Sequence, residues 1–119
     1  MTQEKQALVE RFGMDYKGAL ARFLGNEELY FTFLAEMATD ESLQAIQAAK
    51  KSGDLEALTG AVHALKSTSG TLGFTRLFDA CVVVMDALRS DDPSTAQPFW
   101  EPLEDEFAQA TALCKQLTQ

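Results

Sequence analysis

Hydrophobic residues recur along most of this chain with the spacing of amphipathic helices. In residues 54–73, placed about 100° apart around a helix, one set falls within about 40° of a single direction. That set is Leu58, Val62, Leu65, Ser69 and Leu72. A similar stripe in residues 96–117 consists of Phe99, Leu103, Phe107, Ala110, Cys114 and Leu117. No alternating strand pattern of useful length is present, so the pattern predicts an all-α protein.

Capping residues and glycines divide this pattern into separate helices. Asp15, Asn26 and Asp54 are suited to accept a backbone N–H at a helix start. Glycines are suited to end helices, at Gly13, Gly25, Gly53 and Gly73. The predicted helices are residues 3–12, 16–24, 26–37, 42–51, 54–73, 74–90 and about 96–117. Asp40 restarts or bends the chain between the third and fourth of these, and residues 91–98 form a linker.

The long helices and short connections predict an antiparallel four-helix bundle, with two short extra N-terminal helices covering one end. The chain has 119 residues, of which 46% are hydrophobic. That size suits one compact domain over residues 1–119, built around one core. The aromatic residues are expected mainly in this core, namely Phe31, Phe33, Phe74, Phe78, Phe99 and Trp100.

The formal net charge of −8 narrows the classes of partner. An acidic surface disfavours nucleic acid and anionic membranes, and it favours proteins that carry a basic rim. No apolar run approaches the roughly 20 residues that span a bilayer, and the N-terminus lacks the apolar core of a signal peptide. We therefore expect a cytoplasmic protein. Cys81 and Cys114 lie on apolar stripes, where they are expected to be reduced and buried rather than metal ligands.

The only histidine, His63, lies about 140° from the core stripe of its helix, on the solvent side. Its neighbours on that face are Glu56, Thr59, Gly60, Lys66, Ser67 and Gly70, most of them small. Each glycine costs a helix roughly 0.8–1 kcal/mol relative to alanine. We interpret Gly60, Ser67 and Gly70 as lowering the rim around the imidazole, so that another protein's active site can approach it.

A lone exposed histidine is ordinarily just a solvated side chain, and a lone lysine an ordinary surface charge. The combination favours a chemical role, because neutral imidazole is a good nitrogen nucleophile. A phosphoryl group on His63 would add about two negative charges, which Lys66 at i+3 is placed to offset. The chain shows no carboxylate cluster for Mg²⁺ near His63 and no glycine-rich nucleotide loop. We therefore expect no cofactor and no metal of its own, with Mg²⁺ supplied by a partner.

The stretch HALKSTSGTLG, residues 63–73, resembles the motif H-x-x-K-G-[SA]-[SA]-x-x-x-G of the histidine-containing phosphotransfer (HPt) family. His63, Lys66, Ser69 and Gly73 match it, while Thr68 departs mildly and Ser67 stands where glycine is usual. The segments 15–37 and 52–66 also resemble the family, as does the pattern around Gly70–Phe74 in the phosphotransfer domain of chemotaxis-type histidine kinases.

The resemblance implies a phosphocarrier that is not itself an enzyme. His63 would be phosphorylated by a receiver aspartate or a sensor histidine kinase and would pass the group to a response-regulator receiver. Lys66 would offset the phosphate charge, and Asp79 is expected to orient the imidazole. Receivers would dock on Thr59, Gly60, Ser67 and Gly70. The sequence shows no dimerisation face, so we expect a monomer.

Alternative interpretations remain at this stage. Within the family, the chain is either a stand-alone carrier, which the Met1 start favours, or an excised domain of a larger kinase. Outside it, a helical adaptor would bind signalling proteins through the same face without being phosphorylated. A haem or metal bundle is a third option, disfavoured because one histidine cannot supply paired ligands from facing helices.

Overall fold

The computed structural model describes all residues, 1–119, and every regular element in it is helical. The elements are α1 (Gln3–Phe12), α2 (Tyr16–Arg22), α3 (Glu27–Ala38), α4 (Ser42–Ser52), α5 (Leu55–Leu72), α6 (Thr75–Leu88), the 3₁₀ helix η1 (Pro93–Phe99) and α7 (Trp100–Leu117). The all-α prediction is confirmed. None of these helices is long and apolar enough to cross a membrane.

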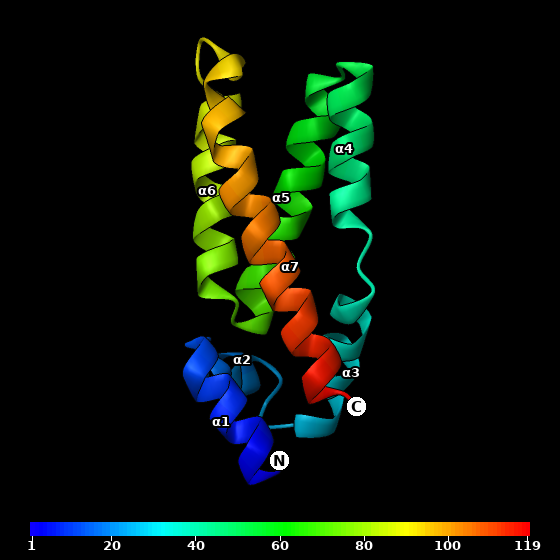
Figure 1. The fold of residues 1–119 in the computed structure, drawn as a ribbon, viewed down its shortest axis with the longest axis vertical. Helices are drawn as coiled ribbons and strands as arrows, with labels where there is room; N and C mark the ends of the chain where they lie inside the picture. The colour runs from blue at the N-terminus through cyan, green and yellow to red at the C-terminus, as the bar shows by residue number, and fades with distance from the viewer.

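The helices form an elongated bundle of 46 × 23 × 20 Å (Figure 1). The helices α5 and α6 run antiparallel as a hairpin, and α7 returns along them. The fourth position is shared by α3 and α4, which follow one another along one edge. Of these two, α3 packs mainly on α7 and α4 mainly on α5. The short helices α1 and α2 lie at the end of the bundle where α5 leads into α6, as predicted.

The predicted caps hold these elements in place. The carboxylates of Asp15 and Asp54 and the side-chain amide oxygen of Asn26 each accept a backbone N–H at 3.0 Å in the first turn of their helices. The side chain of Asp40 accepts the N–H of Ser42 at 2.7 Å. The helix therefore ends after α3, and a new helix, α4, begins at Ser42.

Three predicted helix boundaries are wrong, and one of them is the end of the helix predicted over 74–90, which stops at Leu88. The helix α2 ends at Arg22 rather than at residue 24, because Leu24 takes a left-handed backbone conformation with φ 56°. The final helix begins at Trp100 rather than near residue 96, and part of the predicted linker forms η1 instead. Pro93 and Pro98 both lie within η1, and α7 begins directly after it.

The core is one cluster of 26 buried apolar residues drawn from every helix of the bundle. Phe74 and Trp100 are buried in it, and Phe31 and Phe78 are half-buried. Two aromatic predictions are wrong, since Phe33 is 41% exposed and Phe99 is 38% exposed. Phe33 packs against the ring of Phe23, with 5.4 Å between the ring centroids and an interplanar angle of 38°.

The cysteines Cys81 and Cys114 are buried and unbonded, as predicted. Burial raises the pKa of each thiol to about 12. Both side chains therefore act as small apolar residues in the core.

Candidate functional site

Helix α5 presents His63 on the side opposite its buried stripe. Every residue predicted for that stripe is buried: Leu58, Val62, Leu65, Ser69 and Leu72. The imidazole is exposed and forms no ion pair within the chain. Burial of one face of α5 therefore fixes the other face, with His63 at its middle, towards solvent.

His63 borders an open hollow of about 640 Å³ between α5 and the end of α6. The hollow is lined by Leu55, Glu56, Thr59, Gly60, His63 and Arg89. Thr59 and Gly60 were predicted to lie beside the histidine, and they do. Leu55 and Arg89 were not predicted, because only the packing of α6 against α5 brings Arg89 to this place. Leu55 is 44% exposed, so the hollow also offers an apolar contact.

The two glycines beside His63 have different surroundings. A Cβ added to Gly60 would meet nothing within 4 Å, which fits the predicted low rim. A Cβ added to Gly70 would lie 3.0 Å from Cδ2 and 3.2 Å from Cε2 of Phe78. Gly70 therefore lines an open hollow with Ser67 and Phe78, but the Phe78 ring occupies the space in which a Cβ at Gly70 would lie.

Lys66 lies one turn beyond His63 on α5, and its side chain is half-buried. Its Nζ lies 5.8 Å from the centroid of the Phe78 ring, within range of a cation–π contact. No carboxylate pairs with Lys66, whereas Arg22 and Arg76 both have acidic partners. The Lys66 charge is therefore not neutralised by the chain itself.

Asp79 does not meet His63 in this structure. The antiparallel register of α5 and α6 follows from two relationships. The Phe78 ring lies against Gly70, and Arg89 lines the same hollow as His63. Asp79 follows Phe78 and so lies near the level of Gly70, seven residues or about 10 Å along α5 from His63. The expectation that Asp79 orients the imidazole has no support in this geometry. Asp86, two turns further along the same side of α6, lies at the level of His63.

The remaining motif residues have structural reasons for their size. Ser69 is fully buried between helices, and its hydroxyl donates to the carbonyls of Leu65 and Lys66 at 2.9 and 3.0 Å. Ser67 is exposed and lines the hollows on both flanks of α5, one of them shared with Phe33 and the other with Phe78. A serine at this position therefore adds a hydroxyl to the open face without closing it.

The end of α5 is held by two side-chain hydrogen bonds from other helices and by the backbone conformation of Gly73. The buried hydroxyl of Tyr30 donates to the Leu72 carbonyl at 2.7 Å, and burial raises the pKa of this phenol. The guanidinium of Arg22 donates to the Thr71 carbonyl at 3.1 Å. Gly73 follows with φ +90°, a left-handed conformation that ends the helix. The face that carries His63 therefore belongs to a well-anchored helix.

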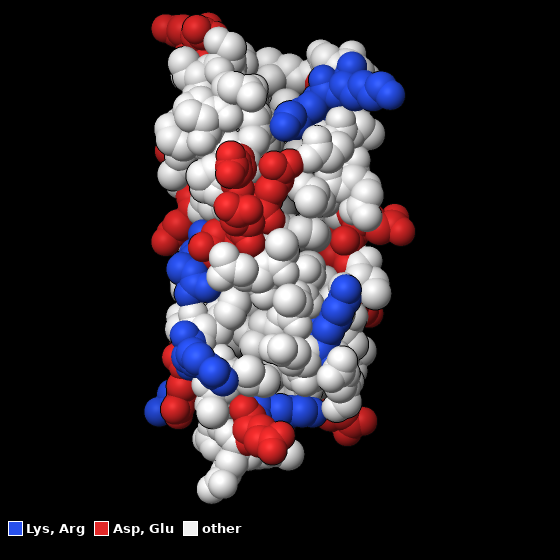
Figure 2. Space-filling model, in the orientation of Figure 1, with Lys and Arg blue, Asp and Glu red and all other residues white.

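Charge distinguishes this face from the face over α7. Acidic side chains gather over α7 in the view of Figure 2, and its sequence contains Glu101, Glu104, Asp105 and Glu106. The cations Lys66 and Arg89 lie along the α5–α6 side instead. The His63 hollow itself carries one cation, Arg89, and one carboxylate, Glu56.

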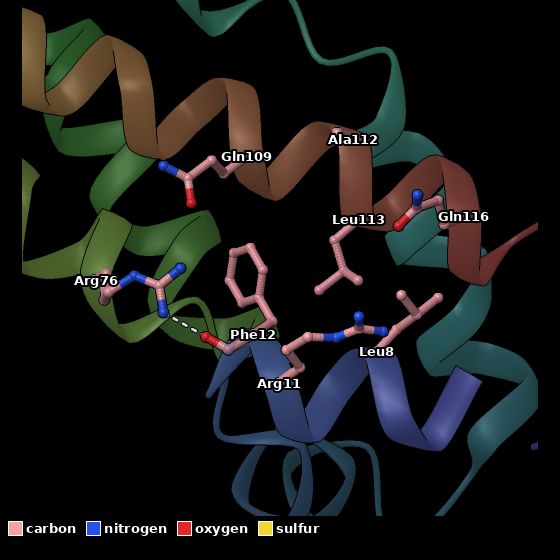
Figure 3. A pocket seen from close by; sticks show the side chains of 8 residues that line it. All are labelled: Leu8, Arg11, Phe12, Arg76, Gln109, Ala112, Leu113 and Gln116. Carbon is pink, nitrogen blue, oxygen red and sulfur yellow. Dashed lines mark hydrogen bonds between the residues drawn. The ribbon is translucent and has the colours of Figure 1, made fainter. Parts of the chain in front are cut away.

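A separate hollow of about 370 Å³ lies between α1 and α7 (Figure 3). Arg76 borders it, donates to the Phe12 carbonyl and pairs with Glu106 at 3.1 Å. The hollow contains no nucleophile or acid–base pair, and its contacts fasten α1 to the bundle. No group of three or more His, Cys, Asp or Glu side chains in the structure is placed to hold a metal ion.

Comparison with known families agrees with this geometry. The Hpt domain family matches residues 28–118, which covers α3 to α7 and includes the whole His63 face of α5. Searches of curated proteins and of solved structures give no match. Hpt domains act in histidine phosphotransfer within two-component phosphorelays, as phosphocarriers rather than catalysts. On the match of most of its length, this chain belongs to the Hpt domain family.

Proposed function

We propose that the protein carries a phosphoryl group on His63 between signalling proteins. The observation that supports this most directly is the exposed imidazole, free of ion pairs, at the open side of a firmly anchored helix. His63 is also the only histidine in the chain, so it is the only imidazole available for the family's chemistry.

The transfer requires little from the carrier itself. A lone pair on one ring nitrogen of neutral His63 attacks phosphorus of a receiver's acyl phosphate. The P–N bond forms as the P–O bond to the aspartate breaks, and the aspartate leaves as a carboxylate. The reverse exchange passes the group to a second receiver. The receivers would supply Mg²⁺ at their own acidic sites, so the carrier needs no cofactor.

Two cations, Lys66 and Arg89, suit this role of His63. A phosphoryl group carries about −1.5 to −2 charges near neutral pH, so it is stabilised by positive groups nearby. Lys66 has no carboxylate partner, and Arg89 lines the hollow that His63 borders. Both are notable in a chain of net charge −8. We assign Lys66 to the phosphoryl oxygens and Arg89 to the acidic rim of a docked receiver.

The docking surface extends on both sides of His63. Gly60 and Thr59 leave room for a receiver on one side, and Leu55 adds exposed apolar area. Ser67 and Gly70 continue the open face on the other side, where they line a hollow with Phe78. This face would take one receiver at a time, with the carrier acting as a monomer.

Phosphate transfer from labelled partners tests the proposal. A panel of radiolabelled phospho-receivers and autophosphorylated sensor kinases is mixed with the wild type and with His63→Gln, whose fold is checked by circular dichroism. We expect acid-labile, base-stable label on the wild type and none on the variant. Label that persists on His63→Gln would mean that another residue is the acceptor. No label from any donor, with the fold intact, would instead indicate a non-phosphorylated adaptor.

A further inference from the structure

The hollow between α1 and α7 differs in charge from the rest of this acidic protein (Figure 3). The chain carries 18 acidic and 10 basic side chains, yet two arginines and no carboxylate line this hollow. Its volume of about 370 Å³ lies within the range of about 300–1,000 Å³ that is typical of sites for small molecules. The hollow therefore combines a suitable size with a positive charge, which favours an anionic ligand.

The two arginines of the hollow are not equivalent. Arg76 pairs with Glu106 at 3.1 Å and donates to the Phe12 carbonyl, so its charge is already compensated. Arg11 has no acidic partner in the structure, and its side chain lies along the hollow (Figure 3). One uncompensated guanidinium suits a monoanion, and its planar fork matches the two oxygens of a carboxylate.

The remaining lining residues suit an apolar chain attached to that carboxylate. Leu113 is buried beneath the hollow, while Leu8 and Phe12 are half-buried on the α1 side. Gln116 reaches from α7 on the side of the hollow where Arg11 lies, as Figure 3 shows, and its amide can donate a further hydrogen bond. A carboxylate beside Arg11 with a short apolar tail over Leu113 would therefore contact both helices.

We propose that this hollow binds a small amphiphilic monocarboxylate, with the carboxylate on Arg11 and the apolar tail between α1 and α7. The site shares no lining residue with the His63 hollow, and the proposal does not depend on phosphotransfer. Helix α1 lies outside the residues 28–118 that match the family, so one wall of this site comes from outside the matched part of the chain. A bound ligand would join α1 more firmly to α7.

Titration of the full chain with straight-chain carboxylates, followed by ¹⁵N–¹H NMR, tests the proposal. The probes are butyrate, hexanoate and octanoate, with 1-octanol as the uncharged control for the tail. We expect octanoate to shift backbone resonances of α1 and of the second half of α7 in a saturable way. Each added methylene should tighten binding about two- to fourfold, and 1-octanol should bind about tenfold more weakly than octanoate.

Three variants test the residues of the site. Arg11→Gln removes the unpaired charge and should weaken octanoate binding about tenfold. Lys51→Gln is the matched control, because both residues are exposed cations in the last turn of a helix, and it should leave binding unchanged. Ala112→Glu adds a carboxylate at an exposed position of the hollow and should abolish binding. Circular dichroism checks that each variant is folded.

Several results would overturn the proposal. Equal affinities for octanoate and 1-octanol would show that the hollow does not recognise a carboxylate. Equal losses in Arg11→Gln and Lys51→Gln would show an effect of net charge alone. Shifts confined to one of the two helices, or none in either up to the highest soluble octanoate concentration, would contradict a site between α1 and α7.

Discussion

The backbones of Gly73 and Asp15 are in direct contact at the end of the bundle. The N–H of Asp15 donates to the Gly73 carbonyl at 2.9 Å, and a Cβ on Gly73 would lie 2.5 Å from the Asp15 carbonyl oxygen. Gly73, the last glycine of the family motif, therefore has two structural roles in this chain. It ends α5 in a left-handed conformation, and it lets the turn between α1 and α2 pack against that end.

Replacing Gly73 by alanine should destabilise the protein strongly. Gly73→Ala adds a left-handed strain of about 1–2 kcal/mol and a clash with backbone that cannot move aside cheaply. We expect the free energy of unfolding in urea to fall by more than about 2 kcal/mol. Gly53→Ala is the matched control, because Gly53 has φ +72° but no atom within 4 Å of an added Cβ. Equal losses in the two variants would show that the contact with Asp15 is unimportant.

The two glycines of the His63 face should respond differently to alanine. Gly60→Ala meets open space, so it should stabilise the protein by about 0.5–1 kcal/mol through helix propensity alone. Gly70→Ala must displace the Phe78 ring, which should remove that gain and leave the variant less stable than Gly60→Ala by at least about 1 kcal/mol. Parallel thermal and urea unfolding measures both. Similar gains in the two variants would show that the Phe78 ring does not occupy the space beside Gly70.

Stability should fall in alkaline solution because of the buried thiols. Burial raises the pKa of Cys81 and Cys114 to about 12 in the folded protein, and an exposed thiol titrates near 8.5. Below about pH 8.5 the thiols are protonated in both the folded and the unfolded protein, so they do not change the free energy of unfolding with pH. Above it the unfolded chain loses them first, and each thiol lowers the unfolding free energy by up to about 1.4 kcal/mol per pH unit until pH approaches 12.

Urea unfolding between pH 7 and 11 measures this slope. The variant Cys81→Ala/Cys114→Ala should be less stable at pH 7 because of the cavities it creates, but its stability should decline less steeply. Tyr30, whose pKa burial also raises, contributes a further decline above about pH 10 in both proteins. An unchanged slope in the double variant would contradict the assignment to the thiols.

Much of the fold was readable from the sequence because its signals are local. The caps at Asp15, Asn26 and Asp54 depend on a few neighbouring residues, and each forms as predicted. The core stripe of α5 follows from helix periodicity alone, so the exposure of His63 was predictable too.

The surroundings of His63 were less readable because they depend on how helices pack. The register between α5 and α6 places Arg89 in the His63 hollow and the Phe78 ring against Gly70. The same register moves Asp79 away from His63. No periodicity within one helix reveals these relationships. The 3₁₀ helix before Trp100 was also missed, because a segment with two prolines resembles a linker in sequence.

The most direct test of the central claim is detection of a phosphorus–nitrogen bond on the histidine ring. The protein is labelled with ¹⁵N, incubated with a phospho-receiver, and its imidazole nitrogens are observed by NMR. Because His63 is the only histidine, its ring signals need no further assignment. We expect one ring nitrogen to shift and couple to phosphorus, and both to return to their starting positions when an unphosphorylated receiver is added. Ring signals that stay unchanged while the protein gains phosphate elsewhere, or gains none from any donor, would contradict the role of His63.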